Sequence, residues 1–284
     1  MTFVTLEGAQ EGVIVDIAGV QTQIREAGSG GTPLVLLHGV LSDGTSWSDV
    51  AGPLSRDRRL VIPDLPLHGR SRTSPDFQPG PEGMVAWLEA LLDELGIVEA
   101  DLCGLSMGGA VATHFAILRP DRLRRLVLVD AANIVYLDEG YRLFIAEMRE
   151  NLEAARGVDV TTSRDCWTDD MGLDGAKSAA GNLCTDPIVM SVLEYLEARG
   201  ISFDQMTQGL DLLEPLGEED LATISAPTLA VWGSDDPFFS AQEAVEKLEG
   251  GIADCRIEVM EGVGHNPVAE RPREFIQLVK GFLG

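Results

Sequence analysis

A serine flanked by glycines has the residue type and spacing of a catalytic nucleophile. The segment 104–109 reads GLSMGG and joins a strand-like run, 99–103, to a helix-like run, 109–118. Glycines allow a tight turn that lifts the Ser106 hydroxyl clear of a sheet. The hydroxyl would also lie at a helix N-terminus, where backbone N–H groups stabilise developing negative charge. The alternative is a glycine-rich turn carrying a serine of no function, since the chain contains 31 glycines.

A serine hydroxyl becomes a nucleophile only with a base in hydrogen-bond reach. The four histidines are His38, His68, His114 and His265. His265 lies in a loop after the last strand-like run, at the carboxyl edge where parallel sheets carry their sites. His114 falls inside the helix that follows the serine, and His68 falls in a polar turn after another strand. We therefore predict that His265 is the base.

The base needs an acid that fixes its tautomer and stabilises the imidazolium. The loop 232–237 (WGSDDP) follows a predicted strand and offers two carboxylates at the same edge. We predict Asp236 as the acid, with Asp235 as its competitor. Asp130, at the end of an earlier strand, is a third candidate, and its alternative role is to hold a loop.

The elements that must position these residues alternate along the chain. Two alternating runs, 12–17 and 20–25, predict an antiparallel hairpin with its turn at residues 18–19. Short apolar runs of the kind buried on both faces follow, interleaved with helical spacing, and predict a mainly parallel sheet with helices on both faces. The acidic, helical stretch from about 134 to 221 interrupts this pattern as an insertion. The predicted strands are 33–37, 59–63, 99–103, 123–129, 227–232 and 255–260, and the predicted helices are 82–95, 109–118, 241–248 and 272–282.

The chain order Ser106, Asp236, His265 resembles that of the α/β-hydrolase family. The segments 36–40 (LLHGV), 64–71 (DLPLHGRS), 119–130 and 271–275 also resemble motifs of that family. One departure is Leu67, where the family usually has glycine. The resemblance implies an α/β-hydrolase fold with a mainly parallel eight-stranded sheet, helices on both faces and an inserted helical cap. It divides the chain into a core, 1–134 with 221–284, and a cap, 135–220.

The resemblance also implies an oxyanion hole made by the backbone N–H groups of Val40 and Met107. We expect His38 to fix this loop rather than to act as a base. A substrate pocket between sheet edge and cap would have apolar walls, although each candidate residue could equally be core. The candidates for substrate contact are His38, Trp47, Leu105, Met107, Val135, Tyr136, Trp167, Phe238 and Val268.

The expected reaction is hydrolysis of a carboxylic ester or lactone of a small, largely apolar substrate through an acyl-enzyme. Alternatives are an acyltransferase or thioesterase, a cofactor-free perhydrolase, C–C bond hydrolysis, and a non-catalytic binding protein of the same fold. No metal is implied, and no nucleotide cofactor either, because the glycines at the turn lack the G-x-G-x-x-G spacing.

Composition restricts the partners. The chain has 46 acidic and 21 basic residues, a net charge of −25, which disfavours nucleic acid and anionic membranes as partners. The four cysteines (Cys103, Cys166, Cys184, Cys255) lack metal-ligand spacing, and we find neither a signal peptide nor a membrane span. We expect a cytoplasmic protein acting on a small molecule. The pattern does not indicate an oligomeric state.

Overall fold

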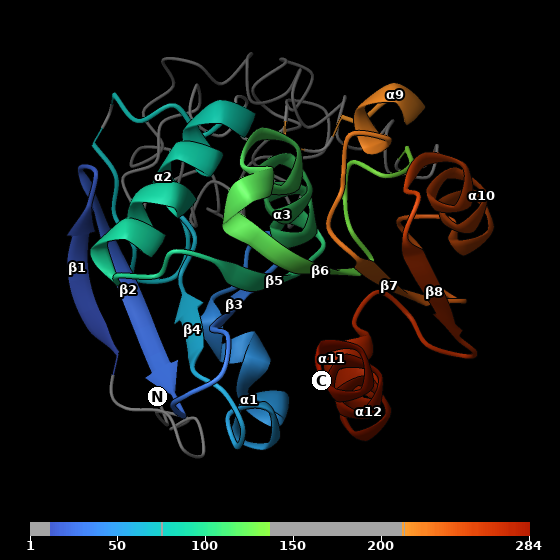
Figure 1. The fold of residues 1–284 in the computed structure, drawn as a ribbon, viewed down its shortest axis with the longest axis horizontal. Coiled ribbons are helices and arrows are strands. Elements are labelled where there is room, and N and C mark those ends of the chain that lie inside the picture. Colours follow the sequence, from blue (N-terminus) through green and yellow to red (C-terminus); the bar gives the residue numbers. More distant parts are fainter. Residues whose placement is uncertain (1–11, 75, 137–211, 213) are drawn as a thin grey trace, which may run out of the picture. The chain divides into compact units, whose positions relative to one another are not determined.

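The computed structural model describes residues 12–74, 76–136, 212 and 214–284. These residues contain one eight-stranded sheet in the order β1-β2-β4-β3-β5-β6-β7-β8 (Figure 1). The first two strands and β4 pair antiparallel, and the pairs from β4 to β8 are parallel. The predicted eight-stranded, mainly parallel sheet is confirmed. The strands are β1 Val13–Ile17, β2 Val20–Ala27, β3 Leu34–Leu37, β4 Leu60–Pro63, β5 Ala100–Leu105, β6 Leu123–Val129, β7 Thr228–Gly233 and β8 Cys255–Met260.

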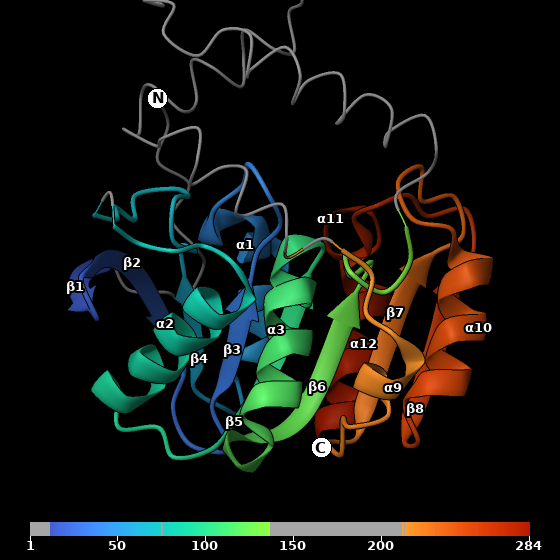
Figure 2. The ribbon, with the colours of Figure 1, turned by 90° about the horizontal axis from the view of Figure 1, so that it is seen from above.

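Helices cover both faces of the sheet, as predicted (Figures 1 and 2). One face carries α2 (Pro81–Glu94), α3 (Met107–Leu118) and α10 (Ala241–Gly251). The other face carries α1 (Ser48–Leu54) and α12 (Pro272–Leu283). Short helical segments connect the layers: η1 Gly44–Trp47, η2 Pro120–Arg122, α9 Glu218–Leu221 and α11 Pro267–Glu270. None of the described helices is both long enough and apolar enough to cross a bilayer.

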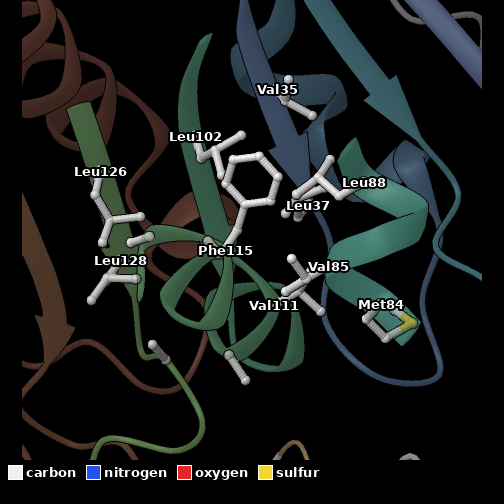
Figure 3. Packing of buried hydrophobic residues seen from close by; sticks show 14 of the residues in the cluster. Val35, Leu37, Met84, Val85, Leu88, Leu102, Val111, Phe115, Leu126 and Leu128 are labelled. Atoms are coloured by element: carbon white, nitrogen blue, oxygen red, sulfur yellow. The ribbon is translucent and has the colours of Figure 1, made fainter. Parts of the chain in front are cut away.

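The central strand β5 is buried along its whole length because its side chains alternate between two cores. Leu102 packs into the core under α2 and α3, and Cys103 packs into the core under α1 and α12. The ring of Phe115, from α3, points towards the sheet beside Leu102 (Figure 3). This packing fixes α3 on the sheet, and α3 begins directly after Ser106.

The edge strand β8 differs from the central strands because its faces are partly exposed. Arg256 donates from Nε to Glu258 Oε1 at 2.8 Å, and both side chains belong to this edge strand. Charged side chains on an edge oppose pairing with a further strand.

The predicted cap, 135–220, falls mostly on residues 137–211 and 213, which lie outside the described residues, so its boundaries stay a prediction. A backbone hydrogen bond links the residues before and after that segment: Leu216 N–H donates to Asn133 O at 2.9 Å. Leu212 is buried in the same core as α2 and α3. Residues 212 and 214–220 therefore include side chains that pack on the sheet domain.

The packing of Phe115 predicts a stability change. Truncating a buried Phe leaves a cavity, so Phe115→Ala should lower the free energy of unfolding by about 3–5 kcal/mol, measured by urea denaturation. Leu118→Ala, at a position 40% exposed on the same helix, serves as the control. Equal losses in the two variants would contradict this account of the core.

Candidate active site

Ser106 lies at a strained turn between β5 and α3. Its backbone has φ 53° and ψ −117°, a conformation that costs a non-glycine residue about 1–3 kcal/mol. Three hydrogen bonds hold the turn in place. The Ser106 N–H donates to Val129 O at 2.9 Å, and the Ser106 carbonyl accepts from Ala110 and Ala132 N–H, both at 3.1 Å. This is the geometry expected of a nucleophile elbow.

Two glycines beside the serine are required by close backbone approach. A Cβ on Gly104 would lie 2.2 Å from the carbonyl oxygen of Gly108. A Cβ on Gly108 would lie 2.2 Å from the carbonyl oxygen of Leu37, in β3. No larger residue fits at either position without moving the backbone. The glycines therefore serve the turn itself, which counts against a serine carried by a chance glycine-rich segment.

The loop after β3 runs beside the serine. A Cβ on Gly39 would lie 3.3 Å from Ser106 Cβ and 3.9 Å from Ser106 Oγ. Val40, the next residue, has a side chain that is 49% exposed. Met107 is the first residue of α3, so its N–H has no acceptor within the helix. Of the two residues expected to form the oxyanion hole, Met107 directly follows the serine, and Val40 follows Gly39, whose backbone lies beside it.

His38 is locked as a neutral imidazole. Its Nε2 accepts from the Leu65 N–H at 2.9 Å, so the proton is on Nδ1, which donates to Gly39 O at 2.8 Å. The ring is fully buried, and burial lowers the pKa of His38. Both nitrogens are used in binding backbone, which agrees with the expected role of fixing the loop. They leave His38 without a polar atom for a substrate, contrary to its place among the candidates for substrate contact.

Asp64 joins this loop to the turn 64–71. Its Oδ1 accepts from Gly44 N–H at 2.9 Å and from Arg25 Nη1 at 2.6 Å. Its Oδ2 accepts from Arg70 N–H at 2.8 Å. Leu67, the departure from the family pattern, has φ 69° and is almost fully buried. A leucine is therefore held in a backbone conformation that favours glycine.

His265 and Asp236 form the hydrogen-bonded pair that the sequence predicts. His265 Nδ1 and Asp236 Oδ2 are 2.8 Å apart. The Asp236 side chain is fully buried, and its Oδ1 accepts from Phe238 N–H at 2.8 Å and Phe239 N–H at 3.3 Å. Asp235, its competitor, is exposed and accepts from Ser234 Oγ at 2.7 Å. With its proton on Nδ1, the ring leaves Nε2 free to accept a proton from a hydroxyl.

Glu270, which sequence reasoning missed, holds the loop that carries His265. Its carboxylate accepts from Gly264 N–H at 3.0 Å and from Asn266 N–H at 3.3 Å, one on each side of the histidine. The Phe238 ring packs edge-on against His265, with centroids 4.8 Å apart. Glu270 follows the histidine by five residues in α11, a short helix with no periodic pattern to reveal it.

The other predicted wall residues have varied surroundings. Trp47, Leu105 and Val268 are buried in the core under α1 and α12, and Met107 and Val135 in the core under α2 and α3. The Tyr136 side chain is 56% exposed, and Trp167 lies outside the described residues. Trp47, at 0% exposure, is a core residue in this structure, and its contact with a substrate stays a prediction.

The third candidate acid, Asp130, belongs to the same cluster. One carboxylate oxygen each of Asp130 and Asp236 and one ring nitrogen of His265 lie within 4.8 Å of one another. Within the described part of the chain, these three side chains are the group whose spacing would also suit a metal ion. The Nδ1 of His265 is already bound to Asp236, so a metal would have to replace that contact.

Comparison with known proteins identifies the family. Residues 34–278 match the model of the alpha/beta hydrolase family. The chain belongs to that family. It is 30% identical to 2-hydroxy-6-oxo-2,4-heptadienoate hydrolase of Pseudomonas putida, over 97% of each chain. It is 28% identical to monoacylglycerol lipase abhd6-B of Xenopus laevis, over 89% of this chain and 76% of the relative.

Solved structures show the same fold. Naproxen esterase from Bacillus subtilis matches with a TM-score of 0.74 at 19% identity, over 96% of this chain and 91% of the esterase. The match to the alpha/beta hydrolase family and the 30% identity to a hydrolase over 97% of each chain support hydrolase activity.

The glycine at the turn gives a stability prediction. Gly108→Ala should lower the free energy of unfolding by about 3 kcal/mol, because its Cβ meets backbone rather than a movable side chain. Gly250→Ala is the matched control, since a Cβ there meets nothing within 4 Å, and it should raise stability by up to about 1 kcal/mol because it lies in α10. Thermal or urea unfolding measures both. A tolerated Gly108→Ala would contradict the close approach of α3 to β3.

Proposed function

We propose that this alpha/beta hydrolase is a serine hydrolase that cleaves a carboxylic ester or lactone of a small, largely apolar substrate through an acyl-enzyme. The observation that carries the proposal is the 2.8 Å contact between His265 and Asp236, at the same sheet edge as the strained Ser106. A nucleophile, a base and an orienting acid are the three groups that acyl transfer requires.

Acylation begins when Ser106 Oγ attacks the substrate carbonyl and His265 Nε2 takes its proton. The backbone N–H groups of Val40 and Met107 stabilise the oxyanion of the tetrahedral intermediate, and one such donor contributes about 3–4 kcal/mol. The intermediate collapses as the C–O bond to the alcohol breaks and His265 protonates the alkoxide. Asp236 keeps the imidazole in the required tautomer and stabilises its charge.

Deacylation repeats these steps with water. His265 takes a proton from water as the water oxygen attacks the acyl carbonyl, and then returns a proton to Ser106 Oγ as the acid leaves. Every group in both steps belongs to the protein, the substrate or water. The reaction therefore needs no redox partner.

A second candidate is hydrolysis of a carbon–carbon bond next to a ketone. It is favoured by the relative named for 2-hydroxy-6-oxo-2,4-heptadienoate, which matches this chain over 97% of its length. The ketone carbonyl would use the same oxyanion donors, but the leaving group would be carbon and would need a proton on carbon.

The two candidates are separated by rates on two substrates. We expect kcat/KM for short-chain p-nitrophenyl esters or lactones to exceed that for 2-hydroxy-6-oxo-2,4-heptadienoate, which is followed by the loss of its conjugated absorbance. The opposite ranking would favour carbon–carbon cleavage. If the protein hydrolyses neither class of substrate, the proposed function is overturned.

The nucleophile is tested directly. Ser106→Ala should lower kcat by a factor of about a thousand or more, because it removes the attacking atom while leaving the oxyanion donors. A fluorophosphonate probe should label the wild-type protein and not the variant, as seen by mass spectrometry. Labelling of Ser106→Ala at another serine, with turnover preserved, would remove Ser106 from the mechanism.

The acid is tested by a matched pair of neighbours. Asp236→Asn should lower kcat by orders of magnitude, since an amide favours the wrong imidazole tautomer. Asp235→Asn, one residue away on the exposed side of the same loop, should leave kcat close to the wild-type value. A larger loss in Asp235→Asn would transfer the role of acid to that residue.

A further inference from the structure

Asp130 is a buried carboxyl group that the proposed mechanism does not use. It follows directly after β6, has φ 40° and is fully buried. Its own N–H donates to Val231 O at 3.0 Å, and its Oδ1 accepts from Gly233 N–H at 2.9 Å. Its Oδ2 is buried and has no hydrogen-bond partner among the described residues. A buried, unpartnered carboxylate oxygen is costly and needs an explanation.

The group beside it is another carboxylate. An oxygen of Asp130 lies within 4.8 Å of an oxygen of Asp236 and of a ring nitrogen of His265. The ionisable groups that face Asp130 are Asp236 from the β7 loop, His265 from the β8 loop and Glu270 from α11. Two of the three are acids, so an ionised Asp130 would be repelled from both directions. Neighbouring carboxylates in a site of this kind share a proton.

Burial raises the pKa of Asp130 to about 9, with the negative charge of Asp236 as a further cause. The hydrogen bond from Gly233 N–H opposes this rise but does not cancel it. The carboxyl group is therefore neutral at pH 7. A neutral carboxyl has an O–H to donate, which an ionised one lacks.

We propose that Asp130 is a positioning residue, a neutral carboxylic acid whose Oδ2–H donates to the carboxylate of Asp236. This single bond gives the unpartnered Oδ2 a partner and removes the repulsion between the two side chains. It adds no charge beside the imidazole.

The hydrogen bonds of Asp236 leave room for this donor. An ionised carboxylate accepts about four hydrogen bonds, two at each oxygen. Oδ1 is used by the N–H groups of Phe238 and Phe239, and Oδ2 is used once, by His265. The proton of Asp130 fills the fourth place. Asp236 is then held from four directions, which fixes the orientation of the His265 ring.

The first experiment compares two variants at Asp130. In Asp130→Asn the amide carbonyl can accept from Gly233 N–H and the NH₂ group can donate to Asp236, as the neutral acid does. This variant should retain most of the wild-type kcat. Asp130→Ala removes the donor, so kcat should fall by about 10- to 100-fold, as is typical for loss of an outer-shell hydrogen bond that orients a metal-binding histidine, with little change in KM. Equal losses in the two variants would overturn the proposal.

The second experiment does not depend on activity, which matters because the positioning role rests on the proposed function. An unfolded Asp has a pKa of about 3.9, so between about pH 4 and pH 9 the folded protein binds a proton at Asp130 that the unfolded chain does not. The contribution of Asp130 to wild-type stability therefore falls as pH rises through this window. Asp130→Asn lacks this dependence, so its Tm relative to the wild type should increase steadily from pH 4 to pH 9. A constant difference would mean an ionised Asp130 and would overturn the proposal.

Infrared spectroscopy and metal analysis complete the test. The wild-type protein at pH 7 should show a carbonyl-stretch band of a protonated carboxylic acid that is missing from Asp130→Asn. Because the three side chains could also surround a metal ion, the protein is dialysed against a chelator and assayed. Retained activity supports the shared proton. If activity is lost and zinc or manganese restores it, a metal ion and not a proton joins the three side chains, and the proposal is overturned.

Discussion

The close approach of α3 to the sheet is the constraint on which the rest of the structure depends. At Gly104 and Gly108 the backbones of β5, α3 and β3 are in direct contact, with no space for a side chain. This contact forces the chain through a turn so sharp that Ser106 takes a positive φ. The large apolar side chains further along α3, such as Phe115, press the helix onto the sheet and oppose the strain. The position of one hydroxyl thus depends on packing over two turns of helix.

Much of this arrangement could be predicted from sequence because it follows local rules. Buried parallel strands appear as short apolar runs, and β5, β6 and β7 lie within two residues of their predicted bounds. The hairpin of β1 and β2 has its turn at Ala18 and Gly19, as predicted, since alternation and a glycine mark it. The pairing of His265 with Asp236 is predictable because loops at the carboxyl edge of a parallel sheet converge.

Other features lie beyond local rules. The helix α1 contains Pro53 and lacks a long apolar stripe, so its spacing does not predict it. Whether Asp235 or Asp236 acts as the acid depends on which side of one turn faces His265. Because the two residues are adjacent and of the same type, the local pattern does not show which one faces the histidine. The contact between Asp130 and Asp236 joins residues more than a hundred positions apart. The role of Glu270 depends likewise on the path of a loop and not on a pattern.

The edge of the sheet has a consequence for how copies of this chain can meet. Arg256 and Glu258 pair along β8, so the last strand offers a charged ladder to any strand that approaches it. A second molecule that added its own edge there would have to dehydrate this ion pair and, at a net charge of −25, overcome repulsion between the two chains. The β8 end of the sheet therefore opposes extension by a strand of a second molecule.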